Sequence, residues 1–223
     1  MNNVLSPVPF TAIDLFAGIG GFRLAIEAFG GKCLHFSEIN RDAIDAYCTN
    51  FGESEFNNLG DIKKIDNLPP HDILTAGVPC QSWSIAGHNL GFDDDRGQLW
   101  NDTLFLLQKS RPKAFVFENV KGLVDPRNQS ALQYILQRIR EAGYFAKYFV
   151  LTSSDYSVPQ DRVRVYIIGF LQEQYLQKFK LPPPQPCHLK LRDVLSIPGG
   201  VSDLQPPDSY DLFGEPVQEK RRY

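Results

Sequence analysis

The chain has 223 residues, 43% of them hydrophobic and 22% charged, so it is long enough to bury one large core. It contains no run of about 18 apolar residues and no signal-like N-terminal pattern, so we expect neither a membrane span nor a secretory leader. Its 23 basic and 26 acidic residues leave a net charge of −3, which is unusual for a protein that binds duplex DNA unaided. The four cysteines form no CxxC pair, which argues against a structural zinc site and a disulfide framework. We therefore expect a cytoplasmic protein without a metal, in which any functional cysteine is a free thiol.

Apolar, β-prone segments alternate along the chain with amphipathic segments of helical length. The expected strands are Phe10–Phe16, Cys33–Ser37, Ile73–Ala76, Ala114–Phe117, Phe145–Leu151 and Val163–Phe170. The expected helices are Gly21–Phe29, Arg41–Phe51, Gln98–Ser110 and Ser130–Ala142. This alternation is typical of a doubly wound, Rossmann-like α/β sheet, which binds its ligands at the carboxyl ends of the strands.

The last two expected strands are joined by the loop Thr152–Arg162, which is too short for a crossover helix. We therefore expect a mostly parallel sheet with an antiparallel strand at its edge. Half of the sixteen prolines follow Phe170, and only a short helix at Lys190–Leu195 is expected there. The composition predicts one domain over residues 1–186, followed by a proline-rich linker or the start of a further region over residues 187–223.

A glycine-rich segment, Asp14–Gly21, ends the first expected strand and opens the first helix. Glycines there let the backbone approach a ligand, and the N-terminus of the helix favours an anion. Glu38 follows the second strand, where an acidic side chain can accept from a ribose hydroxyl. Asp61 can accept from an adenine amino group while Ile62 packs on the ring. Each feature alone fits an ordinary turn or cap, but together they favour a nucleoside cofactor.

Chemically active side chains follow the next strands at the same edge of the sheet. Cys80 lies in a polar loop directly after a proline, where it is poorly placed for core packing, so it is a candidate nucleophile. Glu118 ends the strongly apolar fourth strand and can share a proton with a ring nitrogen. Arg162 and Arg164 lie on one face of the last strand, because side chains alternate, and can donate to a carbonyl oxygen or a phosphate.

Taken in order, these motifs resemble those of the DNA cytosine carbon-5 methyltransferase family over roughly residues 10 to 198. The matching segments are DLFAGIGG, SEIN, GDI, GVPCQSWS with AGHNLGFDDDRGQL, ENVKGL and QDRVR. The resemblance implies a Rossmann-like methyltransferase domain that uses S-adenosyl-L-methionine and belongs to a bacterial restriction-modification system. It implies that the cofactor contacts Asp14, Phe16, Ala17, Gly18, Gly20, Gly21, Glu38, Ile39, Asp61, Ile62, Pro79 and Leu99.

The resemblance also implies the catalytic roles. Cys80 adds to carbon 6 of a cytosine, Glu118 bonds ring nitrogen 3, and Arg164 donates to the ring carbonyl with support from Arg162. The substrate is double-stranded DNA, and the target base must be flipped out of the stack. The loop 82–97 is similar to the mobile catalytic loop of the family. The residues expected around the substrate are Gln81, Ser82, Ser84, Val120 and Asn119, the last in a structural role.

Two departures from the family pattern matter. Trp100 stands where the family commonly has phenylalanine, which is a tolerable exchange of aromatic residues. After residue 195 the sequence soon stops, whereas the family continues into a target-recognition domain and two further motifs. We therefore expect the chain to need a second polypeptide that carries these parts.

Three alternative functions stay open at this level. An RNA cytosine methyltransferase would use the same chemistry. A nicotinamide-dependent oxidoreductase would use the same glycine-rich turn but leaves Cys80, Glu118 and Arg164 unexplained. An inactive, truncated cofactor-binding fragment is compatible with all the motifs.

Overall fold

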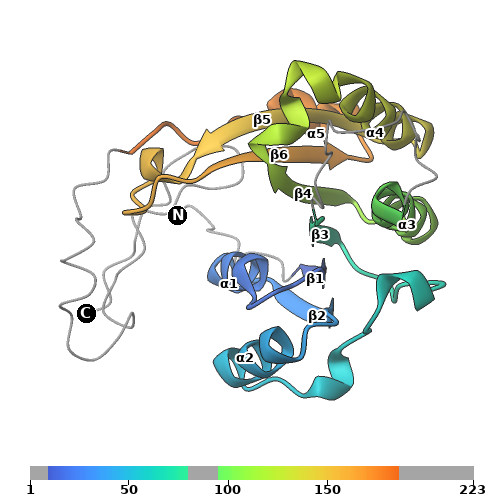
Figure 1. Cartoon of the computed structure of the whole chain (residues 1–223), viewed down its shortest axis with the longest axis vertical. Coiled ribbons are helices and arrows are strands. Elements are labelled where there is room, and N and C mark those ends of the chain that lie inside the picture. The colour runs from blue at the N-terminus through green and yellow to red at the C-terminus, as the bar shows by residue number, and fades with distance from the viewer. Residues whose placement is uncertain (1–9, 80–94, 186–223) are drawn as a thin grey trace, which may run out of the picture.

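The computed structural model describes residues 10–79 and 95–185, which build one six-stranded sheet with helices on both faces (Figure 1). The order of the strands across the sheet is β2-β1-β3-β4-β6-β5. Their bounds are β1 Thr11–Leu15, β2 Lys32–Ser37, β3 Ile73–Gly77, β4 Ala114–Val120, β5 Phe145–Thr152 and β6 Val163–Phe170. This confirms the doubly wound α/β fold expected from the sequence.

Most neighbouring strands in the sheet are parallel. Strands β2, β1, β3 and β4 pair in parallel, whereas β6 runs antiparallel to both of its neighbours, β4 and β5. The reversed strand β6 therefore lies one position inside the edge, and β5 forms the edge itself. The physical reason is how the strands are connected. Helix α4, Gln129–Glu141, crosses over from β4 to β5, and the short loop after β5 then brings β6 between β4 and β5.

Five α-helices accompany the strands in the described part of the chain. They are α1 Gly21–Ala28, α2 Arg41–Phe51, α3 Asp95–Ser110, α4 Gln129–Glu141 and α5 Glu173–Lys178. The first four agree with the expected helices within a few residues at their ends. Helix α5 was not expected, because its six residues are too few for a helical periodicity. The short helix expected at Lys190–Leu195 lies outside the described residues.

Alternation along the strands divides the core between the two faces of the sheet. On one face, Phe115 and Phe117 of β4 pack with Trp100 of α3 and Ile135 of α4, and all four side chains are almost completely buried. The Trp100 ring meets Phe117 edge-on, with 6.1 Å between the ring centroids. Tryptophan is therefore accommodated where the sequence departs from the family pattern. On the other face, α1 and α2 cover β1 and β2 (Figure 1).

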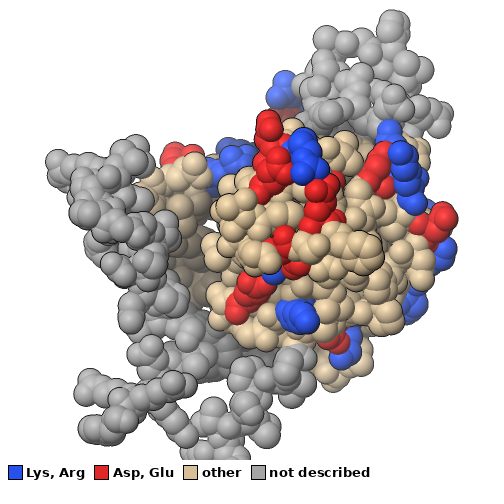
Figure 2. Space-filling model, turned by 90° about the horizontal axis from the view of Figure 1, so that it is seen from below, with Lys and Arg blue, Asp and Glu red and all other residues tan. Residues whose placement is uncertain are grey.

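Charged side chains of both signs are mixed on one face of the molecule (Figure 2). Figure 2 shows one face, on which Lys and Arg do not form a continuous basic surface and are interspersed with Asp and Glu. Within residues 10–79 and 95–185, no helix is long and apolar enough to cross a membrane.

Candidate functional site

The strand pairing brings distant segments of the chain to one edge of the sheet. Strands β1, β3 and β4 end at the same edge of the sheet, because Leu15 pairs with Ala76 and Gly77 pairs with Glu118 near the end of β4. The antiparallel strand β6 starts at the same edge, where Arg164 lies opposite Val120. Ligands of doubly wound sheets bind at this edge.

The turn between β1 and α1 has an unusual backbone. Phe16, Gly18 and Gly20 have φ angles of 53°, 55° and 94°, and a positive φ is rare for a residue other than glycine. At Gly20 a Cβ atom would lie 2.2 Å from the Phe51 ring, whereas at Gly18 no atom lies within 4 Å of that position. Gly20 is thus required for packing inside the protein, and Gly18 leaves open space for a ligand. We call residues 16–20 the glycine loop.

Glu38, directly after β2, ties the glycine loop to its neighbours. Its Oε2 accepts from the backbone N–H of Gly18 at 2.9 Å, and its Oε1 accepts from the N–H groups of Ile39 and Asn40 at 2.8 Å each. Asn58 accepts from the Glu38 N–H at 3.1 Å and donates to the Glu38 carbonyl at 3.0 Å. Because a carboxylate has about four acceptor positions, Glu38 keeps capacity for a ligand hydroxyl. Ile39 beside it is 71% exposed.

The other residues expected to contact a cofactor lie around this loop in different environments. Asp61 caps the short 3₁₀ helix Ile62–Lys64 by accepting from the Lys63 N–H at 3.0 Å. Ile62 is buried in the main core, so packing explains it without a ligand. Ala17 in the loop is buried, and Gly21, the first residue of α1, is exposed. Pro79 and Leu99 are half-buried.

Asp14 precedes the glycine loop and is fully buried. Its Oδ1 accepts from the Thr75 hydroxyl at 2.7 Å, and its Oδ2 has no hydrogen-bond partner among the residues that the structure describes. Burial raises the pKa of Asp14 to about 7, although the Thr75 hydrogen bond acts in the opposite direction. The structure therefore places Asp14 inside the protein, two residues before the glycine loop, where it accepts a hydrogen bond from Thr75 of β3.

A carboxylate and a guanidinium group form an ion pair where β4 and β6 lie side by side. Arg164 Nε lies 2.7 Å from Glu118 Oε1, and both side chains are about one fifth exposed. Tyr166 lies directly opposite Glu118 across the strands. Arg162, Arg164 and Tyr166 line one cavity of about 310 Å³, as expected for alternate residues of one strand. Its other lining residues are Leu151, Thr152, Ser153, Tyr156, Val158 and Pro182.

Asn119 fixes the start of the loop that leads toward Cys80. Its side chain is buried and donates to the Val78 carbonyl at 3.0 Å, while it accepts from the Val120 N–H at 2.9 Å. The hydrogen bond to Val78 connects the end of β4 with the residue that follows β3. The expected nucleophile and its neighbours, Cys80, Gln81, Ser82 and Ser84, lie outside the described residues.

The structure adds two residues that the sequence did not single out. Asn58 holds the backbone of Glu38, and Tyr166 accompanies Glu118 and Arg164. Neither belongs to a motif with an evident mechanism, although alternation from Arg162 and Arg164 places Tyr166 on the same face. Within residues 10–79 and 95–185, no group of three or more His, Cys, Asp or Glu side chains can hold a metal ion.

Comparison with known proteins identifies close relatives. The family model for C-5 cytosine-specific DNA methylase matches residues 10–213. The chain is 48% identical over 212 residues to the Type II methylase M.HgiEI of Herpetosiphon aurantiacus, and this match covers 94% of the chain but 48% of the relative. It is 42% identical to the Type II methyltransferase M.HaeII of Haemophilus aegyptius, over 95% of the chain and 64% of the relative.

Solved structures share the fold. The structure of Spodoptera frugiperda DNMT2 aligns with a TM-score of 0.58 and 26% identity, over 72% of this chain and 50% of that one. The chain spans about half the length of curated relatives such as M.HgiEI.

The two glycines of the turn should respond differently to substitution. Gly18→Ala should cost about 1–2 kcal/mol of stability, because only the left-handed backbone is strained. Gly20→Ala should cost about 1–3 kcal/mol more, because the Phe51 ring must also move. Urea unfolding of both variants measures the difference. Equal losses would show that the Phe51 contact does not restrict Gly20.

Asp14→Asn should change how stability depends on pH. The folded pKa of Asp14, about 7, lies above its ordinary value of 3.8, so folding becomes less favourable as the pH rises from about 4 to 7. The amide variant keeps an acceptor for Thr75 but cannot ionise. From pH 5 to pH 8 its stability relative to the wild type should therefore rise by about 1–3 kcal/mol in denaturant titrations. A constant difference would mean that Asp14 does not titrate in this range.

Proposed function

The chain belongs to the C-5 cytosine-specific DNA methylase family, and on this premise we propose that its residues transfer a methyl group from S-adenosylmethionine to carbon 5 of cytosine in double-stranded DNA. The observation that carries the proposal is the meeting of two different sites at one edge of the sheet. The glycine loop with Glu38 is suited to a nucleoside, and the Glu118–Arg164 pair is suited to a polar base edge. The names of the relatives favour a role in a Type II restriction-modification system.

The residues around the glycine loop fit the proposed cofactor. The open space at Gly18 admits a ligand close to the backbone, and Glu38 has acceptor capacity for ribose hydroxyls. The exposed Ile39 side chain offers an apolar surface for a purine ring. Helix α1 begins without a side-chain cap, so its first N–H groups can bind a carboxylate. When bound, S-adenosylmethionine supplies an electrophilic methyl group.

The Glu118–Arg164 pair matches the edge of a flipped cytosine. Ring nitrogen 3 and the carbonyl oxygen are adjacent acceptors on that edge, and the two side chains lie side by side. Glu118 shares a proton with nitrogen 3 while Arg164 donates to the carbonyl, and Arg162 supports it in the same cavity.

Cys80 completes the proposed chemistry. Its thiolate adds to carbon 6 of the ring that Glu118 polarises, which makes carbon 5 nucleophilic enough to take the methyl group. Loss of the carbon 5 proton then restores the double bond and expels the thiolate. Asn119 contributes by holding the carbonyl of Val78, two residues before Cys80, in place.

We further propose that sequence-specific methylation needs the half of the protein that the relatives possess beyond the matched region, supplied in the same or a second polypeptide. The net charge of −3 offers little attraction for phosphates, and base flipping requires contacts that offset unstacking. Large apolar side chains around α1 are also open to a partner: Ile19, Leu24 and Phe29 are 65%, 66% and 51% exposed.

Calorimetry tests the cofactor site. The wild-type chain should bind S-adenosylmethionine, and Glu38→Ala should weaken binding at least about tenfold, because each lost hydrogen bond leaves a partner unsatisfied at a cost of about 1–3 kcal/mol. Glu55→Ala is the control, since the Glu55 carboxylate forms an exposed ion pair with Arg41. A folded wild-type chain that bound NAD but not S-adenosylmethionine would refute the cofactor assignment.

A trapping experiment tests the nucleophile. DNA containing 5-fluorocytosine cannot lose a proton from carbon 5, so it should form a stable protein adduct in the presence of S-adenosylmethionine. Cys80→Ala should abolish the adduct, which denaturing electrophoresis and mass spectrometry detect. The reaction should be run with and without a polypeptide matching the remaining half of the relatives. An adduct that survives in Cys80→Ala would transfer the role to another residue, and efficient trapping by the chain alone would refute the need for the other half.

A further inference from the structure

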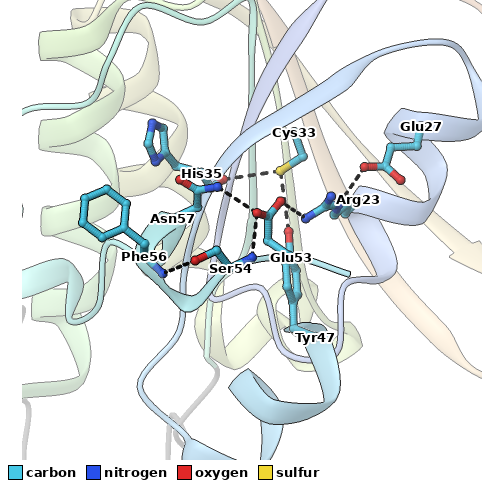
Figure 3. Close-up of polar contacts among 9 residues, drawn as sticks. All are labelled: Arg23, Glu27, Cys33, His35, Tyr47, Glu53, Ser54, Phe56 and Asn57. Carbon is cyan, nitrogen blue, oxygen red and sulfur yellow. Dashed lines mark hydrogen bonds and ion pairs between the residues drawn. The ribbon is translucent and has the colours of Figure 1, made fainter. Parts of the chain in front are cut away.

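A charge cluster centred on a buried arginine lies outside the site described above (Figure 3). Its centre is Arg23, in the first turn of α1, which is only 8% exposed. Arg23 Nε donates to Glu27 Oε1 at 2.7 Å, and Arg23 Nη1 donates to Glu53 Oε2 at 2.8 Å. Glu27 belongs to the same helix, whereas Glu53 follows α2. The Arg23–Glu53 ion pair therefore links α1 to the segment after α2, whereas the Arg23–Glu27 pair lies within α1.

Arg23 also holds the aromatic ring that closes on Gly20. Its guanidinium carbon lies 4.6 Å from the centroid of the Phe51 ring and 5.3 Å from that of Tyr47. Phe51 is the side chain that leaves no room for a Cβ atom at Gly20. The Arg23 side chain, from α1, thus fixes the α2 ring against which the end of the glycine loop is packed.

Glu53 continues the connection toward the other side of the candidate cofactor site. It accepts from the Asn57 side chain at 2.7 Å and from the Ser54 N–H at 2.9 Å. The neighbouring Asn58 bonds both the N–H and the carbonyl of Glu38, and the Glu38 carboxylate returns to Gly18. The contacts form a closed ring from α1 through residues 53–58 to Glu38 and back to the glycine loop.

Burial of the Arg23 side chain needs a reason, since a buried guanidinium costs free energy unless it is fully paired. One partner on its own helix would leave Arg23 free to move with α1. The Glu53 pair instead fixes α1 relative to the segment that holds Glu38. The nearby Cys33 thiol does not make the cluster reactive, because burial raises its pKa to about 11.

We propose that Arg23 and Glu53 are positioning residues that set the distance between the glycine loop and Glu38 for cofactor binding. The inference rests on the proposed function, because it assigns these residues to the S-adenosylmethionine site. They do not touch the cofactor, and their effect passes through Phe51, Gly20 and Asn58.

Two matched carboxylate variants separate positioning from simple stability. Glu53→Gln removes the charge that links α1 to residues 53–58, and Glu27→Gln removes the charge within α1. Calorimetry on the full chain at 25 °C should show about five- to tenfold weaker S-adenosylmethionine binding for Glu53→Gln and less than a twofold change for Glu27→Gln. Arg23→Lys should weaken binding like Glu53→Gln, because a single ammonium cannot reach both carboxylates and stack on Phe51.

Hydrogen exchange provides a readout that does not depend on the cofactor. Exchange in the peptide containing Gly18 should become faster in Glu53→Gln but not in Glu27→Gln, because the Gly18 N–H loses its fixed acceptor geometry. Wild-type affinity and exchange in a Glu53→Gln variant with a lowered Tm would assign the cluster to stability alone and overturn the inference. A wild-type chain that binds no S-adenosylmethionine would remove the proposed function and, with it, this inference.

Discussion

The insertion of β6 between β4 and β5 is the constraint on which the candidate catalytic site depends. Glu118 and Arg164 are 46 residues apart in the chain, and only the antiparallel pairing of β4 with β6 brings them to 2.7 Å. In a sheet continued in parallel, the start of β6 would lie at the opposite edge. The reversed strand instead adds its first residues to the edge where β1, β3 and β4 end. One topological feature therefore brings the Glu118–Arg164 pair to the edge of the sheet that carries the glycine loop.

Two buried charged side chains, Asp14 and Arg23, lie near the glycine loop. Asp14 is fully buried just before the loop, and Arg23 is buried between two carboxylates and two aromatic rings. Burying such groups costs free energy unless they are paired, so their presence indicates that the position of the surrounding residues matters more than the stability that is lost. Phe16, with its positive φ, adds backbone strain at the same turn. The surroundings of the loop are thus organised to hold one conformation.

The chain combines candidate site residues at one edge of its sheet with a net charge of −3. Glu38, Glu118 and Arg164 occupy the edge at which α/β sheets bind ligands, yet the face in Figure 2 has no continuous basic area. About half the length of the relative M.HgiEI lies outside the match. Phosphate contacts and base readout are separate from methyl transfer, so different parts of a protein can carry them. Such a division is compatible with a net charge of −3 in a chain that matches the family model over residues 10–213.

The sequence by itself determined the family, the alternation of strands and helices, and the motif residues, because these depend on local patterns and residue chemistry. It also determined that Arg162 and Arg164 share a face, since strand alternation is a local rule. Only the tertiary structure decided that Gly20 is required by the Phe51 ring whereas Gly18 faces open space. Likewise, only the tertiary structure decided that Ile62 belongs to the core, that Asn58 holds Glu38, and that Arg23 is buried. These facts depend on contacts between elements distant in sequence, which no local pattern encodes.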